Sequence, residues 1–251
     1  MSASKKRLIK KMRQAINDFS MIEWWDVILL AISWGKDSMV LAYLLNEYRK
    51  IIKDKFEIKA VYISKDFLWE DVIKFKNKKD FFDENFTFTL EKVEINLPLD
   101  SKLRDWLGKN CQRCAYARRI ALMKTCQKYW ANKLVLWHHM DDIIVTTMIN
   151  MIEWRKLKIM PPINKMRKWD ITFIRPMAYI REKEILNFAH LMNIPYSDYK
   201  CPIWEDTMRN KVKKEIVWEN EKKFPKYTEN IFWSFIRDFR EKHEKTWYHN
   251  L

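Results

Sequence analysis

The chain has 251 residues, of which 48% are hydrophobic and 15% aromatic, so it can bury a sizeable core and composition argues against global disorder. No uninterrupted apolar run approaches the roughly eighteen residues of a membrane span, and the basic N-terminus lacks the apolar stretch of a secretion signal, so we expect a cytoplasmic protein. The net charge of +15 favours a polyanionic partner such as RNA, with a lysine-rich genome bias as the alternative.

Taken in chain order, residues 4–19 carry apolar side chains at helical spacing between basic ones, which predicts an amphipathic basic helix. Apolar runs then predict five strands, and helical patterns lie between them, notably over 114–130, 140–153 and 181–192. The predicted strands are 26–33, 57–64, 88–96, 133–137 and 172–176. Strands that alternate with helices favour an α/β fold with a doubly wound, mostly parallel five-stranded sheet of Rossmann-like type.

Composition divides the chain into three parts. We expect a basic N-terminal helix over 1–25, an α/β domain over 26–205 and a basic helical C-terminal appendage over 206–251. The appendage either contacts RNA or packs on the core as a solvated helix.

A short polar loop, SWGKDS, joins the first predicted strand to the first helix and consists of Ser33, Trp34, Gly35, Lys36, Asp37 and Ser38. Backbone N–H groups at a helix N-terminus favour an anion, and Lys36 adds a positive charge. Asp37 suits Mg²⁺ coordination better than phosphate binding. The loop therefore predicts a phosphate site, and a chance polar turn is the alternative.

A second polar segment, WHHMDD, follows the fourth predicted strand and opens another helix. It contains His138, His139, Asp141 and Asp142. Paired carboxylates at a helix N-terminus suit a metal or a nucleotide. The alternative is a structural role, in which a buried His–Asp pair caps the helix. Since ligands bind at the carboxyl ends of parallel strands, we expect this segment to lie near the SWGKDS loop, about a hundred residues away in sequence.

The chain has four cysteines. Cys111 and Cys114 form a C-x-x-C pair, Cys201 precedes a proline, and Cys126 lies within a predicted helix as a core or surface thiol. Alone, the pair is compatible with a zinc half-site or a redox pair. Three thiolates also suit a [4Fe–4S] cluster that leaves one iron open.

The two loops resemble the SGGKDS and GHHxDD segments of the PP-loop ATP pyrophosphatases. Further strings resemble the tRNA 2-thiocytidine synthetase family from about residue 14 to 218: NDFSMIEWWD, CQRCAYARRIAL, LKIMPP and IRPMAYIREKEI. Agreement of separate strings in the right order is more specific than any one of them. Cys201 falls where that family has its third cluster cysteine, in the loosest part of the match.

The resemblance implies that ATP adenylates the C2 oxygen of a cytidine at position 32 of a tRNA anticodon loop, and that sulfide then displaces AMP. It implies ATP, Mg²⁺ at Asp37 and a [4Fe–4S] cluster on the three cysteines as cofactors. The SWGKDS loop with His138 and His139 would bind the nucleotide, and Asp141, Asp142 and Arg118 would act in catalysis with the cysteines. Arg118 and Arg119 are surface arginines in the alternative interpretation. Expected partners are tRNA, a sulfur donor such as a cysteine desulfurase and a second copy of the chain, with no membrane.

Other functions stay open. A lysidine synthetase shares the phosphate loop, and EDTMRNKV over 205–212 loosely resembles one of its segments, but that family does not explain the cysteines. A 2-thiouridine synthetase shares the cysteines but adds terminal zinc-ribbon cysteines, which the chain lacks. A basic tRNA-binding pseudoenzyme is the non-enzyme alternative, which Trp34 favours.

Glycine and tryptophan contents are abnormal, with 2 glycines where average composition gives roughly eighteen, and 13 tryptophans. The resembling families carry glycine at Trp25, Trp34, Trp130, Trp137 and Trp154. We interpret this as a gene in which UGA encodes glycine, translated with a code that reads UGA as tryptophan. The alternative is a true tryptophan-rich protein with a damaged nucleotide site.

Overall fold

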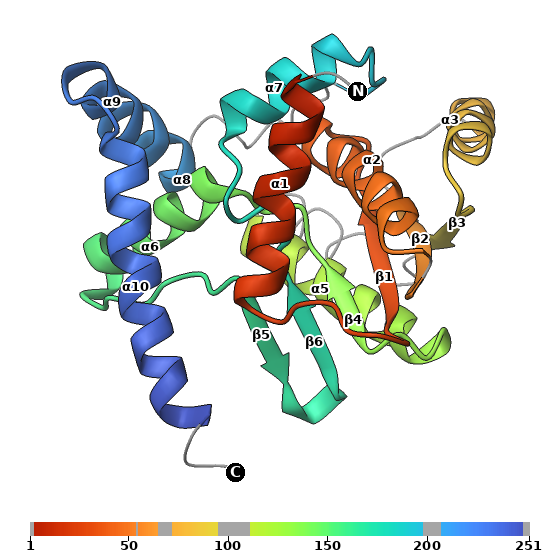
Figure 1. The fold of residues 1–251 in the computed structure, drawn as a ribbon, viewed down its shortest axis with the longest axis horizontal. Coiled ribbons are helices and arrows are strands. Elements are labelled where there is room, and N and C mark those ends of the chain that lie inside the picture. Colours follow the sequence, from red (N-terminus) through yellow and green to blue (C-terminus); the bar gives the residue numbers. More distant parts are fainter. Residues whose placement is uncertain (1–2, 54, 65–71, 95–110, 198–206, 248–251) are drawn as a thin grey trace, which may run out of the picture.

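The computed structural model describes residues 3–53, 55–64, 72–94, 111–197 and 207–247. Of these, 63–64, 72–78, 94, 111–114 and 242–247 are described by their backbone alone. The described residues form an α/β fold around one six-stranded sheet with the strand order β3-β2-β1-β4-β6-β5 (Figure 1). The strands are β1 (Val27–Ile32), β2 (Glu57–Ser64), β3 (Leu90–Glu94), β4 (Lys133–Val135), β5 (Ile163–Met166) and β6 (Ile171–Ile174).

Five of the six strands are parallel, which confirms the predicted sheet. β1 pairs with β2 on one side and with β4 on the other, and β3 and β6 extend the parallel array outward. The prediction missed β5, which pairs antiparallel with β6 at the edge of the sheet. Its sequence, INKM, has two exposed residues between two half-buried ones, so no apolar run marks it.

Helices pack on the sheet, and further helices follow the last strand in the sequence. They are α1 (Ala3–Asp18), α2 (Lys36–Ile51), α3 (Val72–Asn85), α5 (Cys111–Lys128), α6 (Met140–Trp154) and α7 (Glu182–Leu191), followed by α8 (Met208–Lys211), the π-helix η2 (Val212–Trp218), α9 (Glu219–Lys223) and α10 (Tyr227–Trp247). The predicted helical character after residue 206 is therefore present. No helix among the described residues is both long enough and apolar enough to cross a membrane.

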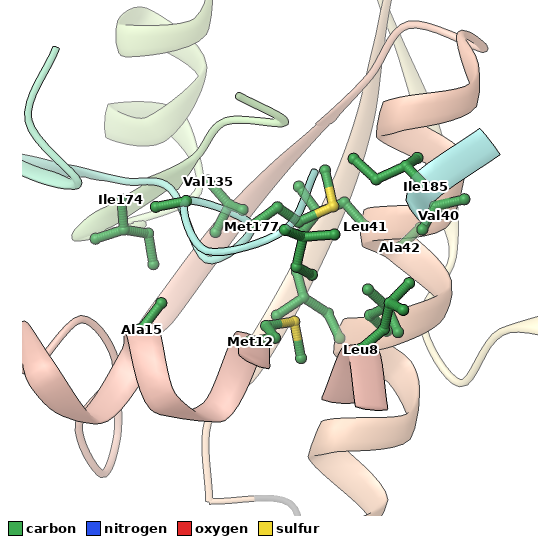
Figure 2. Packing of buried hydrophobic residues seen from close by; sticks show 14 of the residues in the cluster. Leu8, Met12, Ala15, Val40, Leu41, Ala42, Val135, Ile174, Met177 and Ile185 are labelled. Atoms are coloured by element: carbon green, nitrogen blue, oxygen red, sulfur yellow. The ribbon is translucent and has the colours of Figure 1, made fainter. Parts of the chain in front are cut away.

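The core lies on both faces of the sheet, as the alternation of side chains along β1 requires. Ile28, Leu30 and Ile32 belong to a large cluster with α1, α2, α6 and α7. Leu29 and Ala31 face the opposite way and pack in a second cluster with α5. Figure 2 shows part of the first cluster, where Leu8 and Met12 of α1 approach Leu41 of α2 and Met177.

The predicted amphipathic helix at the N-terminus is present as α1. Its apolar residues Leu8, Ile9, Met12 and Ile16 are buried, and the helix packs against α2 and α7. The proposed boundary at residue 205 falls outside the described residues, so the three-part division stays a prediction.

Candidate nucleotide site

The site lies at the point where the strand order reverses. β1 and β4 are parallel neighbours, and the connections that follow them lead to opposite sides of the sheet order. In open α/β sheets, ligands bind in the crevice at the carboxyl ends of such strands. The SWGKDS loop follows β1 and opens α2, and the WHHMDD segment lies between β4 and the first turn of α6. The two predicted segments therefore meet at one edge of the sheet.

Hydroxyl groups hold the phosphate loop around the first turn of α2. The Ser38 hydroxyl donates to the carbonyl of Gly35 at 2.9 Å and accepts from the backbone N–H of Ser33 at 3.2 Å. Gly35 is the N-cap of α2, with φ −71° and ψ 155°, and makes no side-chain cap. The first N–H groups of a helix have no partner within the helix, so this turn can donate to an anion.

Lys36 lies at the centre of an ion network. Its ammonium group is 3.0 Å from Asp37 Oδ1 and 3.0 Å from Glu182 Oε1, and Lys213 of η2 contacts the other oxygen of Glu182. Burial lowers the pKa of Lys36, but the two carboxylates outweigh burial and raise it. Burial also raises the pKa of Glu182, yet Lys213 and Lys36 bring it down to about 2. Both partners are therefore charged near neutral pH.

Asp37 and Asp142 face each other across His139. The imidazole Nε2 is 3.9 Å from Asp37 Oδ1 and 3.4 Å from Asp142 Oδ2. Burial raises the pKa of Asp37, and the negative charge of Asp142 adds to this, while His139 and Lys36 oppose it. Two crowded carboxylates next to a phosphate loop match the oxygen ligands with which proteins hold Mg²⁺ against substrate phosphates. Within the described residues, no three His, Cys, Asp or Glu side chains are already arranged around a metal position.

Arginines fix the orientation of the WHHMDD side chains. Arg209 of α8 donates to Asp142 and, at 3.2 Å, to Thr146; together with both histidines it holds the pKa of Asp142 well below its usual range despite burial. Burial lowers the pKa of His138 to about 3, so its imidazole is neutral. Its Nδ1 accepts from Arg175 Nε at 3.3 Å, which places the imidazole proton on Nε2.

Asp141 is held by Arg181 and by the start of α7, and its Oδ2 also lies 3.6 Å from Nδ1 of His139. Its carboxylate accepts from Arg181 Nε at 3.1 Å and from the backbone N–H of Glu182 at 2.7 Å. Arg181 is buried and also contacts Glu229 at 2.7 Å and Glu221. Asp141 thus connects α6 to the start of α7, whereas Asp142 faces the nucleotide site.

Comparison with known proteins assigns the family. A family model described as a PP-loop domain matches residues 4–220. The chain belongs to this PP-loop family. Proteins named tRNA-cytidine(32) 2-sulfurtransferase are similar along most of their length: that of Janthinobacterium sp. is 31% identical over 235 residues, covering 90% of this chain and 71% of the relative. That of Vibrio campbellii is 32% identical over 238 residues, covering 90% and 75%.

One solved structure is also close in fold. The U34-tRNA thiolase NcsA from Methanococcus maripaludis, described with its [4Fe–4S] cluster, superposes with a TM-score of 0.75 at 26% identity. The match covers 94% of this chain and 79% of that one. The resemblance to tRNA-thiolating PP-loop enzymes that the motifs predicted is therefore confirmed.

The cysteine-containing part of this PP-loop protein is described only in part. Cys111 and Cys114 lie one turn apart at the start of α5, but their side chains, and Cys201 altogether, lie outside the described residues. Their convergence stays a prediction. Cys126 is a fully buried core thiol, and burial raises its pKa to about 12.

The predicted Arg118 lies half-buried on α5, and its catalytic role stays a prediction. Its neighbour Arg119 is exposed, and its charge adds to burial in lowering the pKa of Arg175 to about 10. Arg119 of α5 thus lies close enough to influence the group that orients His138.

Sequence reasoning missed five charged residues of the site: Arg175, Arg181, Glu182, Arg209 and Lys213. Signals for them existed. The first three lie in the IRPMAYIREKEI string and Arg209 lies in EDTMRNKV, both noticed only as family resemblances, and Lys213 directly follows the second string. The region after residue 206 was predicted to be a polar, basic helical segment, so its sequence gave no reason to expect that Arg209 contacts Asp142 or that Lys213 contacts Glu182.

Proposed function

We propose that the protein is an ATP-dependent tRNA sulfurtransferase that converts the cytidine at position 32 of the anticodon loop to 2-thiocytidine. The observation that carries the proposal is the convergence of the phosphate loop with His139 and Asp142 at the switch point between β1 and β4. The names of relatives that are alike over most of their length supply the substrate.

The chain's own residues suit adenylation. The C2 oxygen of cytidine bonds to the α-phosphorus of ATP, the bond between the α- and β-phosphates breaks, and pyrophosphate leaves. The N–H groups at the start of α2 and the ammonium group of Lys36 can bind the departing pyrophosphate, where negative charge grows. Asp37 and Asp142 would hold Mg²⁺, which neutralises phosphate charge when bound.

Adenylation makes the C2 oxygen a good leaving group, so sulfide can bond to C2 while AMP departs. Cys111, Cys114 and Cys201 are the residues that would hold a [4Fe–4S] cluster. The first two fit this role, because residues three apart lie on one face of a helix. When bound through three thiolates, such a cluster would carry the sulfide on its open iron.

The proposal also includes the partners of the enzyme and its cellular location. The substrate is tRNA, whose phosphates match the net charge of +15. A sulfur donor such as a cysteine desulfurase has to replace the sulfide used in each turnover. We propose that the enzyme acts in the cytoplasm, as a homodimer.

The test is anaerobic purification with iron and sulfide, followed by incubation with ATP, Mg²⁺, a sulfide source and tRNA that lacks thiolation. AMP and pyrophosphate should form with tRNA present, and mass analysis of the nucleosides should show 2-thiocytidine. Appearance of lysidine when free lysine is added, or of 2-thiouridine, would replace this function by one of its alternatives. Binding of tRNA without AMP formation would identify a pseudoenzyme.

A further inference from the structure

Three tryptophans adopt a backbone conformation that suits glycine. Trp25, Trp34 and Trp130 have φ values of 70°, 61° and 55°, in the left-handed region. A β-carbon makes this region unfavourable, and bulky residues rarely enter it. Tryptophan supplies 13 of the 251 residues but three of the nine non-glycine residues with positive φ in the described part of the chain.

Trp130 caps the C-terminus of α5. The N–H of Ala131 bonds to the carbonyl of Cys126 at 2.8 Å, and the N–H of Trp130 bonds to that of Gln127 at 3.3 Å. This pair of bonds is a Schellman motif, and glycine is the usual residue at the position that Trp130 occupies. The indole gains no packing in return, because Trp130 is 87% exposed.

The same motif occurs twice more with small polar residues. Ser20 follows α1 and Asn193 follows α7, each with the same pair of backbone bonds and a positive φ. Asparagine tolerates the left-handed region because its short side chain bonds locally. An exposed indole has no such compensation, so Trp130 is the exception among the three caps.

Trp25 lies in the turn that leads into β1. Its N–H bonds to the carbonyl of Lys55 at 2.9 Å, and its side chain is 87% exposed. The adjacent Trp24 differs in its backbone angle and in the contact that its side chain makes. Its backbone is outside the positive-φ region, and the Lys55 ammonium group lies 3.7 Å from its ring centroid. Trp24 therefore makes a favourable cation–π contact, whereas Trp25 takes up a backbone conformation that is unfavourable for its side chain.

Trp34 lies inside the phosphate loop. Its carbonyl accepts from the N–H of Ser197 at 2.7 Å, which fixes the left-handed turn between β1 and α2. Its indole is buried against Phe82, with ring centroids 6.4 Å apart. Phosphate binding needs close approach of the loop backbone, which glycine permits and a side chain at this residue hinders.

We propose that Trp25, Trp34 and Trp130 are glycines in the protein as its own cells make it, because UGA codons at these positions are read there as glycine. The backbone angles support this independently of the family resemblance. The same reading extends to Trp137 and Trp154, where the backbone angle does not require glycine. The part concerning Trp34 rests on the proposed function, whereas the parts concerning Trp25 and Trp130 do not.

The direct test is the gene together with peptide masses of the protein isolated from its native cells. We expect UGA codons at positions 25, 34 and 130, and peptides with the mass of glycine at each. UGG codons there, or peptides with the mass of tryptophan, overturn the proposal.

The second test measures stability in a host that makes the tryptophan chain. Trp25→Gly and Trp130→Gly should each raise Tm by about 2–4 °C, since each removes left-handed strain. Trp24→Gly is the matched control and should lower Tm, because it removes the contact with Lys55 and adds backbone freedom. If Trp25→Gly and Trp130→Gly lower Tm as the control does, the conformational argument is wrong.

The third test is ATP binding by Trp34→Gly, which should be at least tenfold tighter than binding by the tryptophan chain. Unchanged ATP binding, with glycine found at positions 25 and 130, would refute the phosphate-loop assignment and leave the codon proposal standing. Weaker ATP binding by Trp34→Gly would contradict the proposal at position 34.

Discussion

The ammonium group of Lys36, in the phosphate loop, lies 3.0 Å from the carboxylate of Glu182, the first residue of α7. Lys213 of η2 contacts the same carboxylate. The ammonium group that we propose binds the nucleotide is thus paired with an acidic residue of a helix about 150 residues further along the chain, and Lys213 of the C-terminal region shares that acidic residue. Glu182 therefore connects the proposed phosphate loop to the C-terminal helices.

Glu182→Gln should reduce the free energy of unfolding by about 2 kcal/mol, because it removes the carboxylate charge that Lys36 and Lys213 share and leaves Lys36 paired with Asp37 alone. The pH dependence follows from the lowered pKa. Folding holds the pKa of Glu182 near 2 instead of 4.5, so its contribution is complete above about pH 4.5 and is lost as the pH falls toward 2. Thermal unfolding should therefore be less sensitive to pH in Glu182→Gln across this window.

Glu219→Gln is the control for this experiment. Glu219 is exposed and pairs with Lys222 of the same helix, so its loss should leave stability almost unchanged. Equal Tm values for wild type and Glu182→Gln at pH 7 would show that the carboxylate contributes nothing to the fold.

Lys36→Ala and Asp37→Ala should each lower the rate of tRNA-dependent AMP formation by about 10²–10³-fold, since they remove charge aimed at pyrophosphate and Mg²⁺. The absorbance of the reconstituted cluster should stay the same. Lys50→Ala, on the exposed side of the same helix, removes a surface pair with Glu47 and should keep full activity. Undiminished ATP turnover in Lys36→Ala would refute the phosphate-loop assignment.

The sheet was largely predictable because apolar runs mark buried parallel strands. β1 and β4 were found in this way, and the rule that ligands bind at strand ends then joined their loops. The edge strand β5 was missed because an exposed edge needs no apolar run. The hydropathy pattern thus predicts strands that are buried, but it misses a strand such as β5 that is defined by hydrogen bonding to its neighbour and has no apolar run.

The site was predictable only where its residues form a short string. Ser33 to Ser38 and His138 to Asp142 are local motifs with a chemical meaning. Arg181 and Arg209 become part of the site only when distant helices pack together. They lie in strings that resemble family segments, but the spacing and hydropathy around them do not distinguish them from solvated arginines. Likewise, only the fold shows that Asp141 and Asp142, adjacent in sequence, contact opposite nitrogens of His139 and pair with different arginines.

Replacing Cys111, Cys114 or Cys201 by alanine should abolish 2-thiocytidine formation and the absorbance of the cluster. The matched control is Cys126→Ala, which should keep both, because that thiol is buried between β1 and α5. Its cost should be about 1 kcal/mol of stability, from a small cavity. Mass analysis of the tRNA nucleosides measures 2-thiocytidine in each variant. Normal thiolation by Cys201→Ala would exclude that residue from the cluster.

Arg181→Met should destabilise the protein by about 3–5 kcal/mol, because it leaves the buried Asp141 carboxylate without its cation. The same guanidinium contacts Glu229 of α10 and Glu221 of α9, so its loss should also loosen the C-terminal helices from α6 and α7. Limited trypsin digestion should then cleave the C-terminal region of Arg181→Met first, well below its Tm. Arg181→Lys keeps one charge but cannot reach all three carboxylates, and it should fall between wild type and Arg181→Met. If Arg181→Met and wild type show the same Tm and the same digestion pattern, Arg181 is not the link between the nucleotide site and the C-terminal helices.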